Sequence, residues 1–456
     1  MQRRTRIRKA GAANASRRVK AAERIVERVV RSNGASRAIT VAATGDCIVT
    51  RRVSKIADRG FLDVVNLLRS ADCTYGNCEL VMADREQGFP TAAGIMLSVV
   101  VEPYIADELA WLGFDLLGCA NNHATDYGVE GIRTTRASLD RVGIAHAGTG
   151  LSLQEAAAPG YADTPAGRVA LINCASTYPP WAPAVLARSD FKGVPGLNAL
   201  RVQRRYQLEQ RSFEALHAAA RSIAGLEWLG PPAADGAIHW LGNTFVPGTG
   251  PDIISQVAEE DHERVVEAVR VARRNARVVL VGVHSHEAFR NVDTPDKFLQ
   301  PLAHACIDAG ADAVFGAGPH VTWGIELYKE RPIFYSLGDF FFQYETVRGY
   351  AADSYQAYGL DPQTPDPTRA TDVVYVPDDE TWWETFIPLI TFGDDGAQQI
   401  VLHPVSSDRN APRHARGTPV RATGAVARRI IERVAKLSQR FGTTVAFRGG
   451  VGHVRL

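Results

Sequence analysis

The stretch Ala38-Ile39-Thr40-Val41-Ala42-Ala43-Thr44-Gly45-Asp46 joins an apolar, β-like run to a polar cluster at its end. Four more polar clusters end or follow apolar runs: Gly76-Asn77-Cys78-Glu79, Asn121-Asn122-His123, His284-Ser285-His286-Glu287 and Gly318-Pro319-His320. Asp, Asn, Glu and His are typical ligands and proton carriers of hydrolytic metal sites. Because strand ends converge on one edge of an α/β sheet, we expect the five clusters to form one site.

Segments with strand and helix patterns alternate through most of the chain. Residues 259–275 and 296–309 have helical periodicity, and each precedes an apolar, strand-like run, at 277–283 and 313–315. Such alternation predicts an α/β protein, built either on a largely parallel sheet or as a layered αββα sandwich. We expect this domain to span residues 38–456.

Two segments interrupt the alternation, and a basic arm precedes it. Residues 176–258 are rich in Pro, Trp and Gly, and so long an insertion predicts a lid with its own helices that covers the site and recognises the substrate. Residues 347–379 form an irregular loop without clear periodicity. Residues 1–37 are basic, which favours a solvated or helical tail over a docking element for an anionic partner.

The composition excludes several classes of protein. The chain has 456 residues, 45% of them hydrophobic and 22% charged, and a formal net charge of +1. This balance argues against a general nucleic-acid or membrane-surface binder. Since no apolar stretch approaches the roughly 20 residues of a membrane span and no secretory signal is evident, we expect a cytoplasmic protein. Whether it forms a homo-oligomer is left open.

The cysteines carry a separate prediction. The chain has six cysteines and no CxxC pair, so they are expected to be reduced and buried. Cys47 and Cys78 each adjoin a polar cluster. We interpret them as small apolar filler rather than as thiolate ligands.

Taken together, the clusters resemble the CapA family, also called poly-γ-glutamate synthesis proteins, whose members are similar in fold to calcineurin-type metallophosphoesterases. The matching segments are Thr44-Gly45-Asp46, Asn77-Cys78-Glu79, Ala120-Asn121-Asn122-His123-Ala124-Thr125-Asp126-Tyr127-Gly128, Pro332-Ile333-Phe334-Tyr335-Ser336-Leu337-Gly338-Asp339-Phe340 and Arg416-Gly417-Thr418-Pro419. The family's closing block usually has asparagine where this chain has Asp339. The resemblance covers residues 38–456 apart from the middle insertion.

The residues and the resemblance together imply a dinuclear metal site. Such a site needs carboxylates, neutral imidazoles and often an amide oxygen, and its two divalent ions (Mn, Fe or Zn) activate a bridging water. The expected ligands are Asp46, Glu79, Asn122, His284 and His320. In the phosphoesterase pattern the histidine after the ligand asparagine is a general acid. Here that residue is His123, and Asp126 is placed to orient it.

Two departures from the family pattern concern histidines. The family usually has His-Trp-Gly-x-Glu where this chain has His284-Ser285-His286-Glu287, and Gly-x-His-Pro-His where it has Gly316-Ala317-Gly318-Pro319-His320. One imidazole is lost and another gained on loops expected to line one site. We hypothesise that His286 replaces the missing ligand. The alternative is that His286 only supports the ligands and that one metal binds well.

Several candidate residues have structural alternatives. Asp46 could cap a helix, although a ligand role is favoured. Asn121 is interpreted as bonding its own loop rather than as a second ligand, and Asp126 could cap the helix expected near Val129. Substrate contacts are expected from Asn77, Asn121, Glu287 and Trp181.

The leading functional prediction is a metal-dependent hydrolase that acts on a phosphoester or amide bond, such as a γ-glutamyl bond, of a soluble small-molecule or short-polymer substrate. The alternative is a non-catalytic accessory protein in poly-γ-glutamate or capsule synthesis. A nucleotide phosphodiesterase in which Trp181, Trp228 and Trp240 stack a base is least favoured, because no phosphate-binding loop or base-reading module is present.

The His286 hypothesis gives the first testable prediction. If His286 is a ligand, His286→Ala should lower the metal content of the purified protein as severely as His284→Ala does. Elemental analysis of the parent and both variants measures this. Full metal content in the His286 variant would show that this imidazole is not a ligand.

Overall fold

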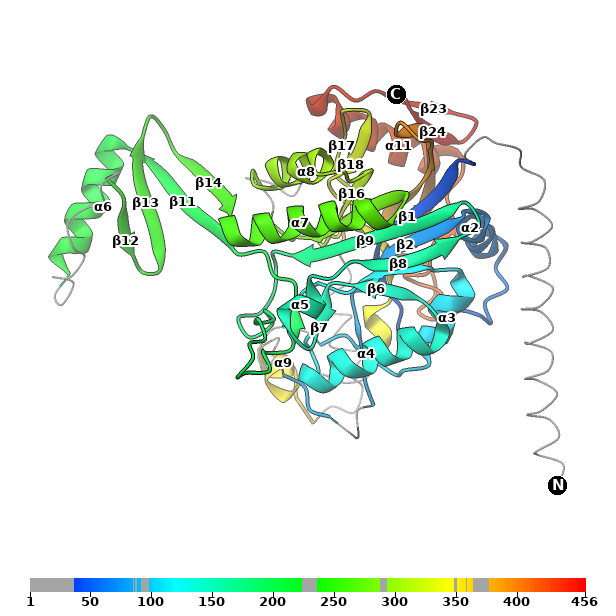
Figure 1. Ribbon diagram of the computed structural model, residues 1–456, viewed down its shortest axis with the longest axis horizontal. Coiled ribbons are helices and arrows are strands. Elements are labelled where there is room, and N and C mark those ends of the chain that lie inside the picture. The colour runs from blue at the N-terminus through cyan, green and yellow to red at the C-terminus, as the bar shows by residue number, and fades with distance from the viewer. Residues whose placement is uncertain are drawn as a thin grey trace.

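The computed structural model describes residues 37–84, 86, 88–91, 98–223, 236–287, 293–347, 351–357, 359–363 and 377–456. Nearly all of the basic arm (1–36), Trp228 and part of the irregular loop lie outside these residues. Two large sheets form the body of the protein (Figure 1).

The larger sheet begins with the opening stretch of the sequence. Strand β1 (Ile39–Ile48) pairs in parallel with β2 (Cys73–Asn77) and β19 (Asp339–Phe342), and antiparallel with β20 (Glu384–Phe392). The sheet continues through β5 (Leu116–Gly118) and β6 (Ala145–Ala147) on one side and through β21 (Ala397–Ser406), β22 (Val420–Arg421), β23 (Val445–Arg448) and β24 (Val451–Val454) on the other. The antiparallel half shows that the expected sheet is only partly parallel.

The smaller sheet has a parallel core. Its order is β17 (Ile325–Tyr328), β18 (Arg331–Phe334), β16 (Ala313–Ala317), β15 (Val278–His284), β9 (Gly167–Ala175) and β8 (Gly160–Thr164). Strands β9, β15, β16 and β18 run parallel to one another. The predicted strands at 277–283 and 313–315 are thereby confirmed, each slightly longer at its carboxyl end.

The two sheets pack face to face. Val41 and Tyr75 of the larger sheet share one core cluster with Leu280 and Phe315 of the smaller sheet, and the rings of Tyr75 and Phe315 stack at 5.2 Å. Since alternate side chains of a strand point to opposite faces, the other faces need separate cover. Burial of this shared apolar face holds the two sheets together.

Helices supply that cover. The outer face of the larger sheet packs against α2 (Arg59–Ser70) and α3 (Ile105–Leu112), and that of the smaller sheet against α7 (Glu259–Asn275) and α8 (Leu299–Asp308). Helix α11 (Gly424–Ser438) packs on the shared core. The α/β expectation is confirmed, and residues 259–275 match α7. The remaining elements are α4 (Gly128–Val142), α5 (Leu153–Ala156), α9 (Ala352–Ala357), β3 (Val81–Met82), β4 (Val100–Val101), β7 (Thr149–Gly150), β10 (Gly196–Leu197), η1 (Tyr344–Thr346), η2 (Glu380–Trp383) and η3 (Gln439–Phe441).

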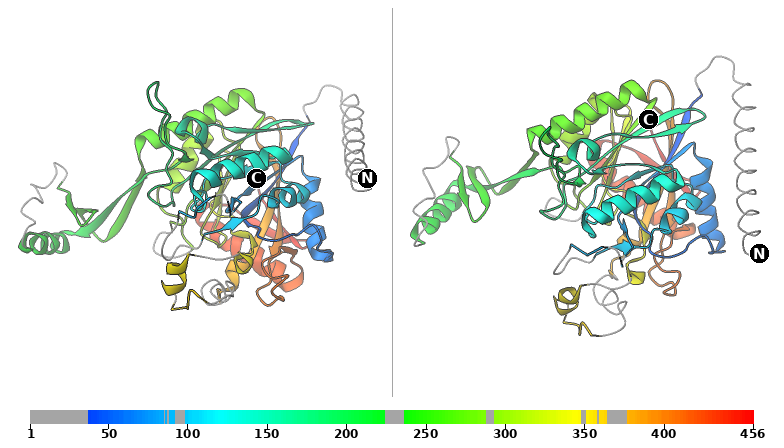
Figure 2. Two further views of the ribbon diagram at one scale, coloured as in Figure 1. Left: turned by 90° about the horizontal axis from the view of Figure 1, so that it is seen from below. Right: turned by 60° about the horizontal axis from the view of Figure 1, so that its bottom comes forward.

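The insertion forms a small sheet of its own. It contains β11 (Val202–Glu209), α6 (Gln210–Ser222), β12 (Ile238–Trp240), β13 (Asn243–Gly248) and β14 (Asp252–Val257). Figures 1 and 2 show it as an arm that projects from the body. At its base Arg204 and Ser255 contact Asp296, which precedes α8. The expected lid is therefore an outward arm in this structure, and closure over the site stays a prediction.

The strand ends of both sheets carry the polar clusters. In the larger sheet, Asp46 on β1 pairs with Asn77 on one side and Asp339 on the other. In the smaller sheet, His284 at the end of β15 pairs with Ala317. The register shifts at Asp46 in both of its pairings, which is how bulges re-aim a side chain near a site.

Gly45 allows the close backbone approach on which this arrangement depends. A Cβ atom at Gly45 would lie 1.7 Å from the carbonyl oxygen of Gly338, and the amide of Asp46 donates to the same oxygen at 2.9 Å. Any side chain at Gly45 would therefore separate β1 from the turn before β19.

We expect Gly45→Ala to lower the free energy of unfolding by at least about 1–3 kcal/mol, the usual cost of overpacking. Denaturant unfolding with a metal chelator present measures this without a contribution from bound metal. Gly250→Ala is the control, because a Cβ at Gly250 meets nothing within 4 Å. Equal stability of the two variants would contradict the close approach.

Candidate metal centre

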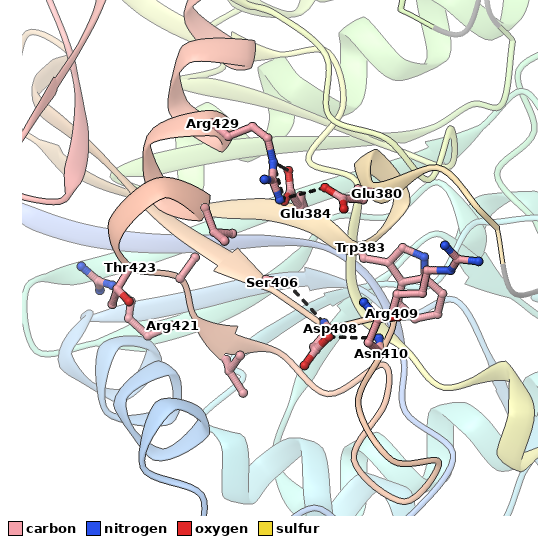
Figure 3. Close-up of a pocket in the computed structure, with 13 residues that line it drawn as sticks. Glu380, Trp383, Glu384, Ser406, Asp408, Arg409, Asn410, Arg421, Thr423 and Arg429 are labelled. Carbon is pink, nitrogen blue, oxygen red and sulfur yellow. Dashed lines mark hydrogen bonds and ion pairs between the residues drawn. The ribbon is translucent and has the colours of Figure 1, made fainter.

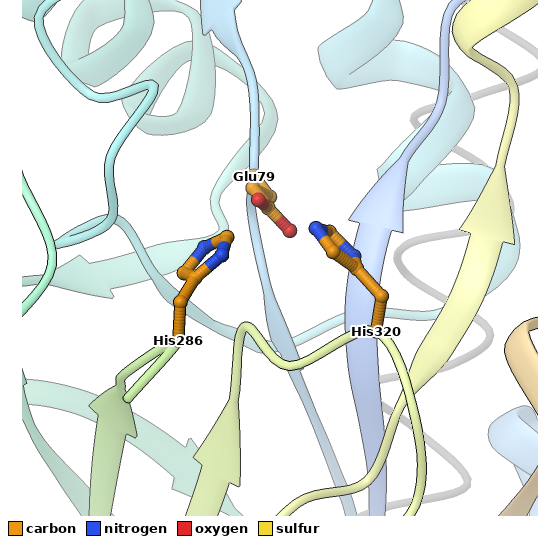
Figure 4. Close-up of side chains that lie close together, drawn as sticks. All are labelled: Glu79, His286 and His320. Atoms are coloured by element: carbon orange, nitrogen blue, oxygen red, sulfur yellow. The ribbon is translucent and has the colours of Figure 1, made fainter. Parts of the chain in front are cut away.

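Asp46, Glu79, His284 and His320, four of the predicted ligands, come together between the two sheets. Asp46, Glu79 and His284 are fully buried, and His320 and Asn122 keep less than a tenth of their surface exposed. Figure 4 shows Glu79, His286 and His320 pointing toward one another from separate chain segments. The sequence prediction that these clusters share one place in the fold agrees with this geometry.

Three sets of ligand atoms lie within 4.8 Å of one another. They are Glu79, His286 and His320; Asp46, His320 and Asp339; and Asp46, Glu79 and His284. Each set shares members with the other two, so the sets form one continuous centre. Asp46, Glu79 and His320 each take part in two of the sets, so the sets meet at these three residues.

The centre contains acceptor atoms that nothing else satisfies. Within the described residues, no hydrogen-bond donor reaches Asn77 Oδ1, Glu79 Oε1, Glu79 Oε2, Asn122 Oδ1 or Asp339 Oδ2. A buried acceptor without a partner costs about 1–3 kcal/mol. A divalent cation bound by oxygen and imidazole ligands would satisfy these atoms together, so the residues present fit a metal.

Burial raises the pKa values of the carboxylates in the centre. It raises the pKa of Asp46 to about 6, a rise that the charge of His320 opposes and that of Asp339 increases. Burial and then the charge of Asp46 raise the pKa of Glu79 well above its usual value, and burial alone does so for Asp339. Three carboxylates in one dry centre favour protonation unless a cation is present.

Burial has the opposite effect on the imidazoles. It lowers the pKa values of His284 and His286 well below the usual value, and the charge of His320 adds to this in both. Burial also lowers the pKa of His320, against the charge of Asp46. These histidines are therefore neutral at pH 7, the form in which imidazole binds a metal.

His286 lies beside His284, as its hypothesised ligand role requires. Their Nε2 atoms are 2.9 Å apart, and the backbone amide of His286 donates to Thr177 Oγ1 at 2.9 Å. His286 also belongs to the set with Glu79 and His320. Its position suits a ligand, and the role itself stays a proposal.

His123 and Asp126 form a pair at the edge of the centre. His123 Nδ1 is 2.8 Å from Asp126 Oδ2, and its Nε2 is 3.9 Å from Glu79 Oε1 and 3.5 Å from the Tyr344 hydroxyl. Asp126 also accepts from the amide of Val99. Helix α4 starts at Gly128 without a side-chain cap, so the capping alternative for Asp126 was wrong.

The expected substrate-binding residues lie in different surroundings. Asn77 lies inside the centre, with Nδ2 2.7 Å from Asp46 Oδ1 and 3.2 Å from His284 Nδ1. Asn121 bonds the carbonyl of Cys78 and the amide of His123, which agrees with a structural role in its loop. Trp181 is 49% exposed, at the base of the insertion.

Glu287 anchors the insertion to the loop after β15. Its carboxylate accepts hydrogen bonds from Ser176, Thr177 and Ser285. It also forms an ion pair with Arg204 at 3.2 Å. These contacts and the burial of Glu287 favour a structural role. A contact between Glu287 and the substrate stays a prediction.

Three residues of the centre were missed from the sequence. Asp339 enters one ligand set, the Trp382 ring stacks on His320 at 5.1 Å, and the Tyr344 hydroxyl lies near His123. A signal existed for Asp339, since it replaces the asparagine of the family's closing block. Trp382 and Tyr344 carried no such signal.

The cysteine prediction is confirmed for Cys47, Cys73, Cys78, Cys119, Cys174 and Cys306, which are all free and buried. Burial raises the pKa of Cys47 well above its usual value. A hydrogen bond with Cys119 and burial do the same for Cys78. Both thiols therefore resist ionisation, which supports the filler interpretation over a thiolate ligand.

A separate cavity of about 390 Å³ lies between β20, β21 and the start of α11 (Figure 3). Its cations are largely paired: Arg429 bridges Glu380 and Glu384, and Arg409 pairs with Asp378. None of the predicted site residues lines it. The cavity therefore does not belong to the metal centre.

The chain is similar in sequence to bacterial capsule synthesis proteins. The family model of the bacterial capsule synthesis protein PGA_cap matches residues 40–344. An uncharacterized protein, y4sH of Sinorhizobium fredii, is 34% identical over 433 residues, 91% of this chain and 93% of its own length. The capsule biosynthesis protein CapA of Bacillus anthracis is 25% identical over 311 residues, which are 67% of this chain and 60% of the relative. The PGA biosynthesis protein CapA of Bacillus subtilis is 26% identical over 312 residues, 67% of this chain and 63% of the relative.

In the part of the chain that the structure describes, no helix combines the length and the apolar character that a bilayer crossing requires.

Because the pKa values of the buried carboxylates are raised, we expect metal binding to release protons. Glu79, an expected ligand with a pKa raised well above normal, must lose its proton to bind a metal, and a cation beside Asp339, whose pKa is also raised, favours loss of that proton too. The three histidines are already neutral. We expect about one or more protons released per protein at about pH 7, and an affinity that rises with pH. Calorimetric titration of the chelator-treated protein with Mn²⁺, in buffers of different ionisation enthalpy, measures the number. An affinity independent of pH between about 6 and 8, without proton release, would contradict the shifts.

Proposed function

The chain belongs to the bacterial capsule synthesis protein (PGA_cap) family, and from this premise and the geometry of the centre we propose that it is a metal-dependent hydrolase. The observation that carries the proposal is the set of buried, unsatisfied acceptors among interlocking ligand groups. A protein that only bound a partner would have no need to bury three carboxylates together. The two packed sheets with outer helices support a calcineurin-like metallophosphoesterase sandwich as its fold.

The proposed ligands divide by chemistry. Asp46, Glu79 and Asn122 would supply oxygens, and His284, His286 and His320 would supply nitrogens, for two divalent ions of Mn, Fe or Zn. Such ions lower the pKa of a bound water and polarise the bond under attack. This set of ligands suits the hydrolysis of a phosphoester and of an amide equally, because a metal-activated water is the nucleophile for either bond.

His123 is the proposed general acid. Its Nδ1 is held by Asp126 at 2.8 Å, so the ring presents Nε2 to the centre. From there Nε2 can give a proton to the leaving oxygen or nitrogen of the substrate. A positioned general acid typically contributes about 10²–10⁴-fold to the rate.

A non-catalytic accessory role is the second candidate. It is favoured by the relatives' names, which include a probable polyglutamine synthesis accessory protein of Mycobacterium tuberculosis, 26% identical over 231 residues. An accessory protein of poly-γ-glutamate or capsule synthesis, the alternative that the family resemblance implies, would bind a polyanion such as polyglutamate without cleaving it. The two candidates separate in one experiment, in which metal-loaded protein is given bis(p-nitrophenyl) phosphate, γ-glutamyl-p-nitroanilide and polyglutamate. Binding of polyglutamate with no hydrolysis of any substrate would favour the accessory role.

The general acid gives a prediction about leaving groups. His123→Ala should keep its metal but lose about 10²–10⁴-fold in kcat on phosphodiesters with alkyl leaving groups, which need a proton to depart. The loss should be much smaller on p-nitrophenyl esters, whose leaving group departs as a stable anion. Elemental analysis and steady-state kinetics on both ester types measure this.

His146→Ala is the matched control. His146 is also largely buried and has a carboxylate partner, with Nε2 3.2 Å from Asp140 Oδ1, but lies on β6 outside the ligand sets. It should keep both metal and activity. An equal loss of rate on both ester types in the His123 variant would show that His123 does not protonate the leaving group.

A further inference from the structure

Asp339 is the one carboxylate of the centre that the sequence prediction did not include. It is 1% exposed at the start of β19, and its backbone pairs with that of Asp46. Its Oδ1 lies 2.8 Å from His320 Nδ1, whereas Asp46 Oδ2 is 3.8 Å from the same nitrogen. Asp339 is thus the direct hydrogen-bond partner of His320.

His320 occupies an unusual backbone conformation. Its φ angle is 60°, in the left-handed region that costs a side-chain-bearing residue about 1 kcal/mol or more. Such a conformation persists only where the surroundings hold it. The ring stacks on Trp382 with planes 20° apart and meets the ring of His286 edge-on at 5.2 Å, so its position is determined from several sides.

The bond to Asp339 settles which ring nitrogen faces the centre. A cation bound at the centre would hold Asp339 as a carboxylate, which only accepts a hydrogen bond, so the proton of the neutral imidazole would then reside on Nδ1 and the lone pair on Nε2. With Nδ1 engaged, His320 offers Nε2 to the set that it forms with Glu79 and His286 (Figure 4). Carboxylate partners of this kind orient metal-binding histidines and raise their basicity.

We propose that Asp339 is a positioning residue, which fixes the tautomer and orientation of His320 so that Nε2 binds the metal. This rests on the proposed metal centre but not on hydrolysis. A different role is conceivable on geometry, since Asp339 Oδ2 has no hydrogen-bond donor among the described residues and could bind the ion directly. The two roles predict different results when the carboxylate of Asp339 is replaced by the amide of asparagine.

Asparagine separates the two roles. Its amide oxygen can still accept the Nδ1–H bond of His320, but it carries no charge and is a weaker ligand than a carboxylate. A positioning role therefore predicts partial rescue by Asp339→Asn relative to Asp339→Ala. A direct ligand role predicts that both substitutions weaken metal binding alike.

The experiment measures the affinity of the chelator-treated full chain for Mn²⁺ and for Co²⁺, by competition with a chromophoric chelator. We expect Asp339→Ala to bind about 10–100-fold more weakly, and Asp339→Asn to fall between it and the parent. Asp312→Ala is the control, because Asp312 is also buried and pairs with Arg273 at 2.7 Å, outside the ligand sets. It should lose stability but keep the parent affinity. Parent affinity in Asp339→Ala, or equal weakening in both Asp339 variants, would overturn the proposal.

A second measurement needs no substitution at Asp339 and applies if those variants fail to fold. In the parent loaded with diamagnetic Zn²⁺, labelled with ¹⁵N-histidine, the NMR signals of His320 are identified by their loss in His320→Gln. The proposal requires the Nδ1–H tautomer, and an Nε2–H tautomer would overturn it. Tight metal binding that depends on Asp339, without hydrolysis of any substrate, would defeat the proposed function and leave this inference standing.

Discussion

Asp46, Glu79 and Asp339 bring three carboxylates into one buried centre, where their mutual repulsion must be relieved by protons or by cations. Burial is the largest cause of the raised pKa values of all three, and repulsion between the carboxylates adds to it for Asp46 and Glu79. The neighbouring imidazoles are neutral for the same reason of burial and so cannot balance the charge. Protons or a bound cation can relieve the repulsion, and a cation would also satisfy the oxygens of the centre that have no hydrogen-bond donor.

The scaffold makes this concentration of charge possible by fixing the backbone closely. A Cβ at Gly45 would collide with Gly338, and one at Gly316 would lie 1.9 Å from the carbonyl oxygen of Tyr335. At both places a strand end approaches another backbone more closely than a side chain permits. The packed apolar face between the sheets, with Tyr75 stacked on Phe315, lies directly behind the polar residues and excludes water from that side.

The centre and the insertion are joined through one loop. Glu287 follows His286 by one residue and binds Ser176 and Thr177 at the base of the insertion. A movement of the arm would therefore be transmitted to a loop that carries candidate ligands. The base of the insertion is thus connected to the centre, although its small sheet projects away from the body (Figure 1).

Local sequence patterns determined the fold class and most members of the centre. Apolar periodicity marks α7 and β15, and polar residues at strand ends mark Asp46, Glu79 and His284, because both signals lie within a few neighbouring residues. Tertiary structure alone decided what each polar group contacts. Asp339 contacts His320, Glu287 binds the insertion through Arg204, and Trp382 stacks on His320, all through contacts between distant segments. Such contacts depend on strand register and on the packing of two sheets, which no local periodicity encodes.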